Sequence, residues 1–342
     1  MYSESDILRA AEILRTGGLV AFPTETVYGL GANALDERAV AKIFEAKGRP
    51  RFDPLIVHIA DRSWLSRLVA DWSLQAERLA DRFWPGPLTL VLPKTEIVPD
   101  LVTSGCDTVA VRMPDHPVAQ TLLRAADVPV AAPSANPFGR ISPTTAGHVR
   151  DQLGDRIDLI LDGGPCRVGV ESSVLQLGPS GATLLRPGGV TVEEIEELIG
   201  PLQIGGVTPL DHANSSPGES EVHSRPGLVS PGNLASHYAP RTPLMLWDRR
   251  RPESEAAVQQ ALASAQSSRV GLLAFRPPDS VSAYAVIEVL SNTGDLQEAA
   301  ARFFAALRRL DAAGVDLIIA DLFPEVGLGR ALNDRLRRAA HA

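Results

Sequence analysis

The fold of this chain is set by the stretch Leu19-Val-Ala-Phe-Pro-Thr-Glu-Thr-Val-Tyr-Gly-Leu-Gly-Ala-Asn-Ala34 and by the stretch Ala46-Lys-Gly-Arg-Pro-Arg-Phe-Asp-Pro-Leu-Ile-Val-His-Ile59. The first begins with an apolar strand that ends at Pro23, because proline cannot donate a hydrogen bond to a sheet ladder. Between the two, Asp36 is a favourable N-cap for a helix with an apolar stripe. That helix ends in a basic turn with Lys47 and Arg49, and an apolar strand follows. Two strand ends and a cationic turn come together here, and we therefore predict a functional site.

Length and composition bound the remaining possibilities. At 342 residues, the chain is long for one hydrophobic core, and two domains are expected. The net charge of −8 argues against a broad nucleic-acid surface held by phosphate contacts. The two cysteines, Cys106 and Cys166, predict neither a disulfide framework nor a zinc site. Because the sequence shows no signal-peptide pattern and no apolar stretch of about 18 residues, a cytoplasmic protein is expected.

The pattern of apolar residues divides the chain into three parts. In residues 1–200, predicted strands and helices are mixed, which predicts an α/β fold with a mixed twisted sheet and helices packed on it. Residues 201–240 are rich in glycine and proline without periodicity, and they predict a long linker that serves as an active-site lid. Residues 241–342 return to strand-helix alternation, which predicts a small Rossmann-like α/β domain.

Familiar nucleotide and metal motifs are excluded. Gly29-x-Gly31-x-x-Ala34 matches the dinucleotide fingerprint by letter, but its glycines do not come directly off the strand and no suitable helix opens at Gly31. The sequence has no Gly-x-x-x-x-Gly-Lys-Ser/Thr, which excludes a P-loop. The seven histidines show no metal-ligand spacing, so no protein ligand to a metal is assigned.

Several predicted strands adjoin a polar group that can bind an anion. These groups are Lys47, Arg49, Arg112, Ser134, Asn136 and Arg186. Taken alone, an arginine at a strand end is more often a solvated surface group, and His58 in its apolar strand is more often a hydrogen-bonded core histidine. Ligands of α/β sheets bind at strand ends, and the coincidence of these groups in an acidic chain predicts a pocket for a polyanion.

Long blocks of the sequence closely resemble the YrdC-like family over about residues 5–200. The blocks are Phe22-Pro-Thr-Glu-Thr-Val-Tyr-Gly-Leu-Gly31, Lys47-Gly-Arg-Pro, Pro54-Leu-Ile-Val-His58, Trp84-Pro-Gly-Pro-Leu-Thr-Leu, Arg112-Met-Pro, Ser134-Ala-Asn136 and Leu185-Arg-Pro-Gly. Ser230-Pro-Gly and His237-Tyr-Ala-Pro, followed by a small α/β domain, resemble the two-domain members of this family, which make threonylcarbamoyl-AMP.

The resemblance implies an activity and a set of site residues. L-threonine, bicarbonate and ATP would give threonylcarbamoyl-AMP and pyrophosphate, with Mg²⁺ accompanying ATP, and the product would pass to the tRNA threonylcarbamoyl-transferase machinery. The residues implied at L-threonine are Thr26, His58, Arg112, Ala132 and one of Ser172 and Ser173. The residues implied at ATP are Lys47, Arg49, Asp53, Thr108, Ser134, Asn136, Ser142, Arg186 and Tyr238, with Lys47 and Arg49 also assigned as catalytic cations.

Some features leave alternatives open. The family commonly has asparagine at the position of Asp53, and a negative charge there is unfavourable beside phosphates. Asn233-Leu-Ala-Ser236 also differs from the basic and aromatic version of some relatives. A double-stranded RNA binder, which the acidic balance disfavours, and a carbamoyl transferase with another acceptor stay open beside the synthase. The role of the C-terminal domain, the oligomeric state and the protein partners are not predicted.

Overall fold

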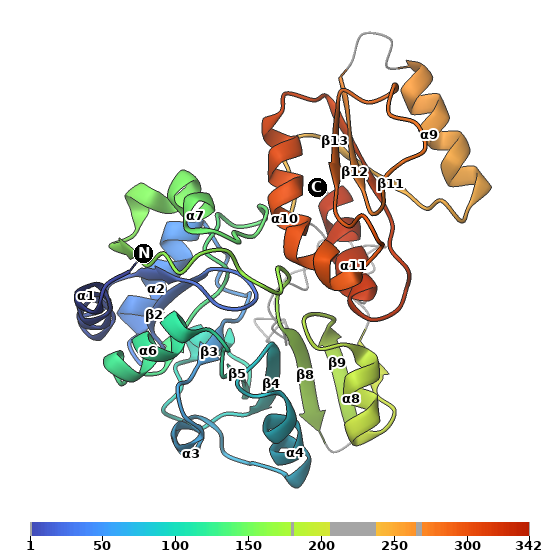
Figure 1. Cartoon of the computed structure of the whole chain (residues 1–342). Helices are drawn as coiled ribbons and strands as arrows, with labels where there is room; N and C mark the ends of the chain where they lie inside the picture. Colours follow the sequence, from blue (N-terminus) through green and yellow to red (C-terminus); the bar gives the residue numbers. More distant parts are fainter. Residues whose placement is uncertain (1, 179–180, 206–236, 265–268, 342) are drawn as a thin grey trace, which may run out of the picture.

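A computed structural model describes residues 2–178, 181–205, 237–264 and 269–341. It shows two sheets with helices around them, one formed by the part of the chain before residue 205 and one by the part after residue 243 (Figure 1). This arrangement confirms the predicted fold class, a mixed α/β domain followed by a smaller α/β domain. Within the described residues, no helix is both long and apolar enough to span a membrane.

The first sheet has ten strands in the order β10-β9-β8-β4-β5-β3-β6-β2-β1-β7. Their bounds are β1 Val20–Phe22, β2 Gly29–Asn33, β3 Ile56–His58, β4 Leu88–Pro93, β5 Thr108–Arg112, β6 Val130–Ala131, β7 Leu159–Ile160, β8 Ser173–Gly178, β9 Gly181–Arg186 and β10 Gln203–Ile204. The pairing is mixed, because β3 runs parallel to β5 and antiparallel to β6. Arg112 and His58 are register partners at the ends of β5 and β3.

Eight helices belong to the described part of this domain. Their bounds are α1 Glu4–Arg15, α2 Glu37–Lys47, α3 Leu65–Leu68, α4 Leu74–Phe83, α5 Asp100–Thr103, α6 Pro117–Ala126, α7 Ala146–Leu153 and α8 Val192–Ile199, with short 3-10 turns at Arg62–Trp64 and Gly154–Arg156. The predicted N-cap of α2 is confirmed, since the Asp36 carboxylate accepts from the backbone of Arg38 and Ala39. Gly48 ends the helix with φ 61°, a left-handed conformation that suits glycine. Lys47 is thereby fixed as a buried residue of the last turn.

Three elements differ from the sequence prediction. The glycine-rich β2 was not predicted as a strand, yet it pairs antiparallel with β1. A Cβ at Gly31 would lie 2.8 Å from both Phe22 and Val130, so this glycine serves close packing within the sheet and its neighbours. The sequence of residues 62–70 has a helical pattern and predicts one helix, but the structure shows a 3-10 turn at Arg62–Trp64 followed by the single-turn α3. Residues 203–204, within the predicted linker, form β10 and pair with β9.

The second sheet is parallel, with strand order β11-β14-β12-β13. Its elements are β11 Leu244–Trp247, α9 Pro252–Ser264, β12 Val270–Ala274, β13 Val286–Val289, α10 Leu296–Ala312, β14 Leu317–Asp321 and α11 Leu328–Ala340. The short edge strand β13 was missed, because its four residues are only half-buried and Glu288 interrupts its apolar residues. Most of the predicted linker, including Ser230–Gly232 and Asn233–Ser236, lies outside the described residues.

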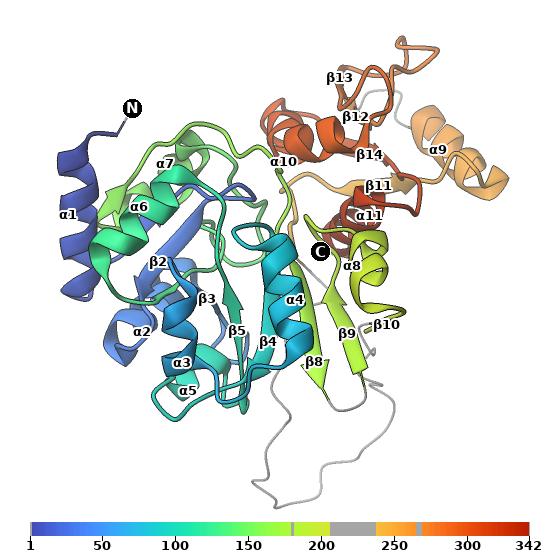
Figure 2. The ribbon, with the colours of Figure 1, turned by 60° about the horizontal axis from the view of Figure 1, so that its bottom comes forward.

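The two domains share an apolar cluster. Val27, Ile141 and Val170 of the first domain are buried in the same cluster as Phe303 and Phe304 of α10. Tyr238, which precedes β11, belongs to this cluster as well. Helix α11 lies beside α8, where Arg330 forms an ion pair of 3.1 Å with Glu193 (Figure 2). The second domain is therefore packed against the first domain beside the ends of its strands.

Candidate active site

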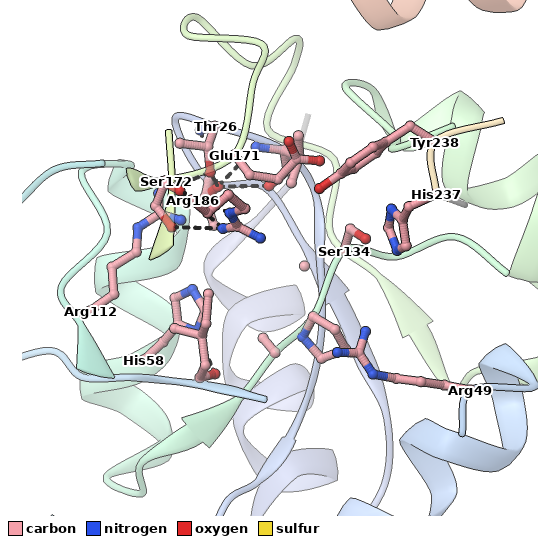
Figure 3. A pocket seen from close by; sticks show the side chains of 16 residues that line it. Thr26, Arg49, His58, Arg112, Ser134, Glu171, Ser172, Arg186, His237 and Tyr238 are labelled. Atoms are coloured by element: carbon pink, nitrogen blue, oxygen red, sulfur yellow. Dashed lines mark hydrogen bonds between the residues drawn. The ribbon is translucent and has the colours of Figure 1, made fainter. Parts of the chain in front are cut away.

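A pocket lies at the strand ends of the first domain, as the sequence predicted for an anion site (Figure 3). It is lined by Thr24, Thr26, Val27, Gly29, Arg49, Ile56, His58, Arg112, Ala132, Pro133, Ser134, Glu171, Ser172, Arg186, His237 and Tyr238. Arg112 and His58 lie on one side of the cavity, and Arg49 and His237 lie on the opposite side (Figure 3). Arg186 and Ser134 lie between these two sides.

Arg112 is held in place by an acid that the sequence analysis did not assign to the site. Its Nη2 donates to Glu25 Oε1 at 2.6 Å and to Thr26 Oγ1 at 2.9 Å, and its Nε donates to the carbonyl of Gly86 at 3.3 Å. The second oxygen of Glu25 accepts from the backbone of Asp115 at 2.9 Å. Arg112 and Glu25 are both buried, so the guanidinium has a fixed orientation at the end of β5.

His58 is both a pocket residue and a hydrogen-bonded core histidine, the two interpretations that the sequence allowed. It lines the pocket, and its Nδ1 lies 3.2 Å from the carbonyl of Ile56, as expected for a hydrogen-bonded core histidine. Burial, and secondarily the positive charge of Arg112, lowers the pKa of His58 to about 3. The ring is therefore neutral near pH 7, and it adds no charge beside Arg112.

Arg49 and Lys47 are both buried, but only Arg49 lines the pocket. Arg49 Nη2 lies 2.9 Å from the Asp53 carboxylate and donates to the carbonyl of Pro54 at 2.8 Å. Lys47 Nζ donates to the carbonyl of Ser134 at 2.5 Å and to that of Asn136. Burial, followed by repulsion from Arg49, holds the pKa of Lys47 well below its usual value. Lys47 thus binds the backbone of the Ser134–Asn136 loop and does not line the cavity.

Other predicted residues lie around the pocket without lining it. Thr108 begins β5, whose opposite end carries Arg112. Asn136 Nδ2 donates to the carbonyls of Pro137 and Arg140 at 2.8 Å each. Ser142 Oγ donates to Glu171 Oε1 at 2.6 Å. Ser173 Oγ donates to the carbonyl of Val190, whereas Ser172 lines the pocket, so Ser172 is the serine that faces the cavity.

The segment that begins at His237, where the described residues resume, contributes two aromatic residues to the pocket. The Tyr238 side chain is buried, and its hydroxyl points toward the cavity (Figure 3). Its ring centroid lies 5.8 Å from that of Phe304, and burial raises the pKa of its hydroxyl. His237, which was not predicted, also lines the pocket. Burial, followed by the charges of Arg49 and Lys47, holds the pKa of His237 well below its usual value.

The charges and donors of this pocket suit an anionic ligand. Arg186 donates to the carbonyl of Ser172 at 3.0 Å and to its hydroxyl at 3.3 Å. Burial lowers the pKa of Arg186 and of Arg49, because both guanidinium groups lose hydration. An anion between them would replace that lost hydration with direct charge pairing. The missed acid Glu171 carries a negative charge at the same wall, and no motif in the sequence indicated it.

The described residues offer no preformed metal site of their own. They contain no group of three or more His, Cys, Asp or Glu side chains that could hold a metal ion. Two acids in and beside the pocket, Asp53 and Glu171, are paired with Arg49 and Arg335. A divalent cation at this pocket would therefore depend mainly on oxygen ligands from a bound phosphate compound and water.

Comparisons with known proteins cover both domains. A family model described as "Telomere recombination" matches residues 12–188, and one described as "Threonylcarbamoyl-AMP synthase, C-terminal domain" matches residues 190–341. The chain is 45% identical to a threonylcarbamoyl-AMP synthase of Pyrococcus abyssi, covering 97% of this chain and 93% of the relative. It is 44% identical to that of Bacillus subtilis, covering 99% and 94%. The crystal structure of P. abyssi Sua5 complexed with L-threonine superposes with a TM-score of 0.88 at 43% identity, covering 99% of this chain and 95% of that one.

Proposed function

Because the chain belongs to the threonylcarbamoyl-AMP synthase family, we propose that its pocket binds L-threonine on the Arg112 side and ATP on the Arg49 side. The enzyme is a nucleotidyltransferase that makes threonylcarbamoyl-AMP for the threonylcarbamoyladenosine modification of tRNA. The observation that carries the proposed geometry is that Arg112 and Arg49 face one cavity from opposite sides, with Arg186 between them (Figure 3). The related protein solved with L-threonine supports a threonine site in this fold.

The threonine side consists of Thr26, His58, Arg112, Ala132 and Ser172. Glu25, Thr26 and the Gly86 carbonyl hold Nη2 and Nε of Arg112, so the guanidinium has a fixed orientation. Its Nη1 N–H groups would bind the substrate carboxylate, which thereby meets a preorganised charged partner. Neutral His58 leaves the positive charge of this side to Arg112.

The proposed ATP side consists of four residues that line the cavity: Arg49, Ser134, Arg186 and Tyr238. Lys47 and Asn136 lie next to these residues without lining the cavity. Arg49 and Arg186 face the cavity and would bind phosphate oxygens. Lys47 acts through the Ser134–Asn136 loop, whose carbonyls it binds. Asp53 competes with phosphate for Arg49, which gives the aspartate at this position a direct effect on ATP affinity. Asn136, Ser142 and Thr108 would contact the nucleotide only after a local rearrangement.

The chemistry requires two anions to approach each other. The threonine amine attacks the carbon of bicarbonate, water leaves, and an N-carboxylate forms. One oxygen of this carboxylate attacks the α-phosphorus of ATP while the bond to the leaving pyrophosphate breaks. Fixed cations stabilise both the approach and the leaving group, and holding the reactants in line supplies much of the acceleration. Mg²⁺ would enter with ATP and neutralise part of its phosphate charge, held mainly by phosphates and water.

The finished adenylate is a reactive mixed anhydride and must reach the tRNA threonylcarbamoyl-transferase machinery before water hydrolyses it. Tyr238, near the end of the predicted linker and lid of residues 201–240, lines the pocket and would shield the anhydride. Direct binding to tRNA is not required for this step, and the net charge of −8 disfavours it.

Pyrophosphate release tests the reaction directly. The full-length enzyme is assayed with ATP and Mg²⁺, with and without L-threonine and bicarbonate. We expect release only when all substrates are present, together with threonylcarbamoyl-AMP as the adenylate product by mass spectrometry. Threonine-independent release of pyrophosphate, or a carbamoylated product without threonine, would contradict the proposed function.

A further inference from the structure

The C-terminal domain places one arginine in the wall of the active site. Arg335 of α11 has a fully buried side chain, with 0% of its surface exposed. Its Nε donates to Glu171 Oε2 at 3.0 Å, and its Nη1 donates to the carbonyl of Pro187 at 2.7 Å. Both partners belong to the first domain, and Glu171 lines the pocket. The ion pair therefore joins the second domain to the substrate cavity itself.

The same arginine also contacts Tyr238, a second residue that lines the pocket. Its guanidinium carbon lies 5.4 Å from the ring centroid of Tyr238, within the range of a cation–π interaction. The backbone N–H of His237 donates to the carbonyl of Arg338, one turn further along α11. The remaining oxygen of Glu171 accepts from Ser142 at 2.6 Å. Arg335 thus connects a wall carboxylate, a pocket aromatic residue and the helix that follows the second sheet.

The charge of Glu171 makes this connection relevant to ATP. A buried carboxylate in a wall that faces phosphates repels them strongly, because the low dielectric of a buried site enhances charge interactions. Pairing with a buried arginine cancels most of that repulsion. Asp334 accepts from Arg335 Nη1 at 2.9 Å but also from Arg338, so its charge is shared on α11 itself. Without Arg335, the Glu171 side chain would keep one hydrogen bond within the described residues, from the Ser142 hydroxyl, and Arg186 would be the positive charge left near it.

A second ion pair between the domains provides a comparison. Arg330, on the same helix, binds Glu193 of α8 at 3.1 Å, but the two side chains are 33% and 48% exposed. Neither residue lines the pocket. This pair holds the domains together at the surface, where solvent weakens it. If Arg335 only held the domains together, its loss would resemble the loss of Arg330.

We propose that Arg335 is a positioning residue of the synthase reaction: it neutralises Glu171 and holds Tyr238, so that the C-terminal domain completes the ATP side of the pocket. This proposal rests on the proposed function, because it concerns the same ATP site. It gives the second domain a specific role in substrate binding. It also predicts different effects on the two substrates, because within the part of the chain that the structure describes neither Arg112 nor Glu25 on the threonine side forms a hydrogen bond or ion pair with Arg335.

Full-length Arg335→Gln and the control Arg330→Gln test the proposal. The dissociation constants of a non-hydrolysable ATP analogue and of L-threonine are measured by calorimetry, each without the other substrate. We expect Arg335→Gln to weaken the analogue by about tenfold or more, while threonine binding changes by less than about threefold. Arg330→Gln is expected to leave both constants unchanged. Equal weakening of both ligands, or no weakening of the analogue, would overturn the proposal.

The double variant Glu171→Gln/Arg335→Gln distinguishes charge from packing. It removes both charges, and Glu171→Gln keeps the shape of the glutamate, so we expect analogue affinity within about threefold of wild type. A double variant as weak as Arg335→Gln would overturn the neutralising role. If Arg335→Gln fails to fold, Arg335→Met, which also removes the positive charge, replaces it, and the same comparison between analogue and threonine decides. A failure of the proposed function would instead appear in the wild-type enzyme, as pyrophosphate release without threonine.

Discussion

At the residue scale, the proposed function assigns one buried arginine to each substrate, Arg112 to the threonine carboxylate and Arg49 to the phosphates of ATP. Arg112→Lys keeps a charge but loses the planar guanidinium that Glu25, Thr26 and Gly86 hold in place, and an imperfectly paired carboxylate costs roughly 1.5–3 kcal/mol. We therefore expect the KM for threonine to rise by about tenfold or more, with a much smaller change for ATP. Steady-state kinetics with each substrate varied in turn would measure both values.

Arg49→Lys is the reciprocal control for that experiment. It lies on the opposite side of the cavity, so its effect should fall mainly on the KM for ATP. A parallel rise in both constants for both variants would mean that neither arginine belongs to one substrate. Loss of folded protein is checked by thermal unfolding of each variant.

The lowered pKa of His58 predicts that the free energy of unfolding depends on pH. Its pKa is about 3 in the folded chain, mainly through burial, and about 6.5 in the unfolded chain. The unfolded state therefore binds more protons between these values, so stability is complete above about pH 6.5 and falls as the pH decreases toward 3. At pH 5 the loss from this residue is about 2 kcal/mol.

Urea unfolding at pH 7 and pH 5 measures this effect. We expect His58→Gln to reduce the decrease in unfolding free energy between the two pH values. The control is His341→Gln, at the exposed position that follows α11. An identical decrease in wild type and His58→Gln would show that His58 is not the group that titrates.

Arginines and hydroxyls of this site could be predicted from the sequence, because each stands next to an apolar strand or a recognised motif. The acids Glu25 and Glu171 could not. An acid in an anion site is unfavourable when considered alone, and its partner lies far along the chain. Glu25 pairs with Arg112 and Glu171 with Arg335, so only the three-dimensional contacts explain their presence. Lys47 is the opposite case. The sequence predicted that it contacts ATP, but in the structure its Nζ donates to the carbonyls of Ser134 and Asn136.

At the element scale, the segment His237–Pro240 holds an aromatic wall against the pocket. Ala239 donates its backbone N–H to the carbonyl of Gly139 at 2.8 Å, and the Tyr238 ring packs near Phe304. One side of the segment is therefore bound to the first domain and the other to α10. An aromatic residue such as Tyr238, between His237 and Pro240, predicts an anchored end to the linker, because a tether needs no aromatic residue. The sequence missed β2 and β10, because short glycine-rich or exposed strands lack an apolar pattern.

Tyr238 gives a prediction for this segment. Tyr238→Ala removes the ring and its packing, and we expect ATP affinity to fall by about tenfold with a smaller change in threonine affinity. Tyr238→Phe keeps the ring in the same backbone conformation and removes only the hydroxyl, so a loss of about threefold is expected. Calorimetric titration of the three proteins measures both effects. Wild-type affinity in all three would show that the segment is a tether only.

At the scale of the whole molecule, the two domains approach each other through backbone at Gly169. A Cβ at this position would clash with the carbonyl of Ala300 and would lie 2.5 Å from the Cα of Ala301, both in α10. Gly169 lies two residues before Glu171, in the chain that forms the pocket wall. The apolar side chains of Val27, Ile141 and Val170 are buried in the same domain contact. The shape of this interface was not predictable, because it depends on contacts between residues more than a hundred positions apart.

Gly169→Ala should therefore move the domains apart and weaken ATP binding. Gly169→Ala would destabilise the protein in two ways: alanine is strained at φ +77°, and its Cβ would clash with α10. Gly164→Ala is a control for the backbone strain alone, because Gly164 has φ +82° in the same loop but nothing lies within 4 Å of its added Cβ. We expect Gly164→Ala to lose about 1–2 kcal/mol of stability with ATP affinity retained. Gly169→Ala should lose more stability, bind ATP less tightly and show a larger radius of gyration by X-ray scattering. Equal behaviour of the two variants would mean that close packing against α10 does not shape the ATP site.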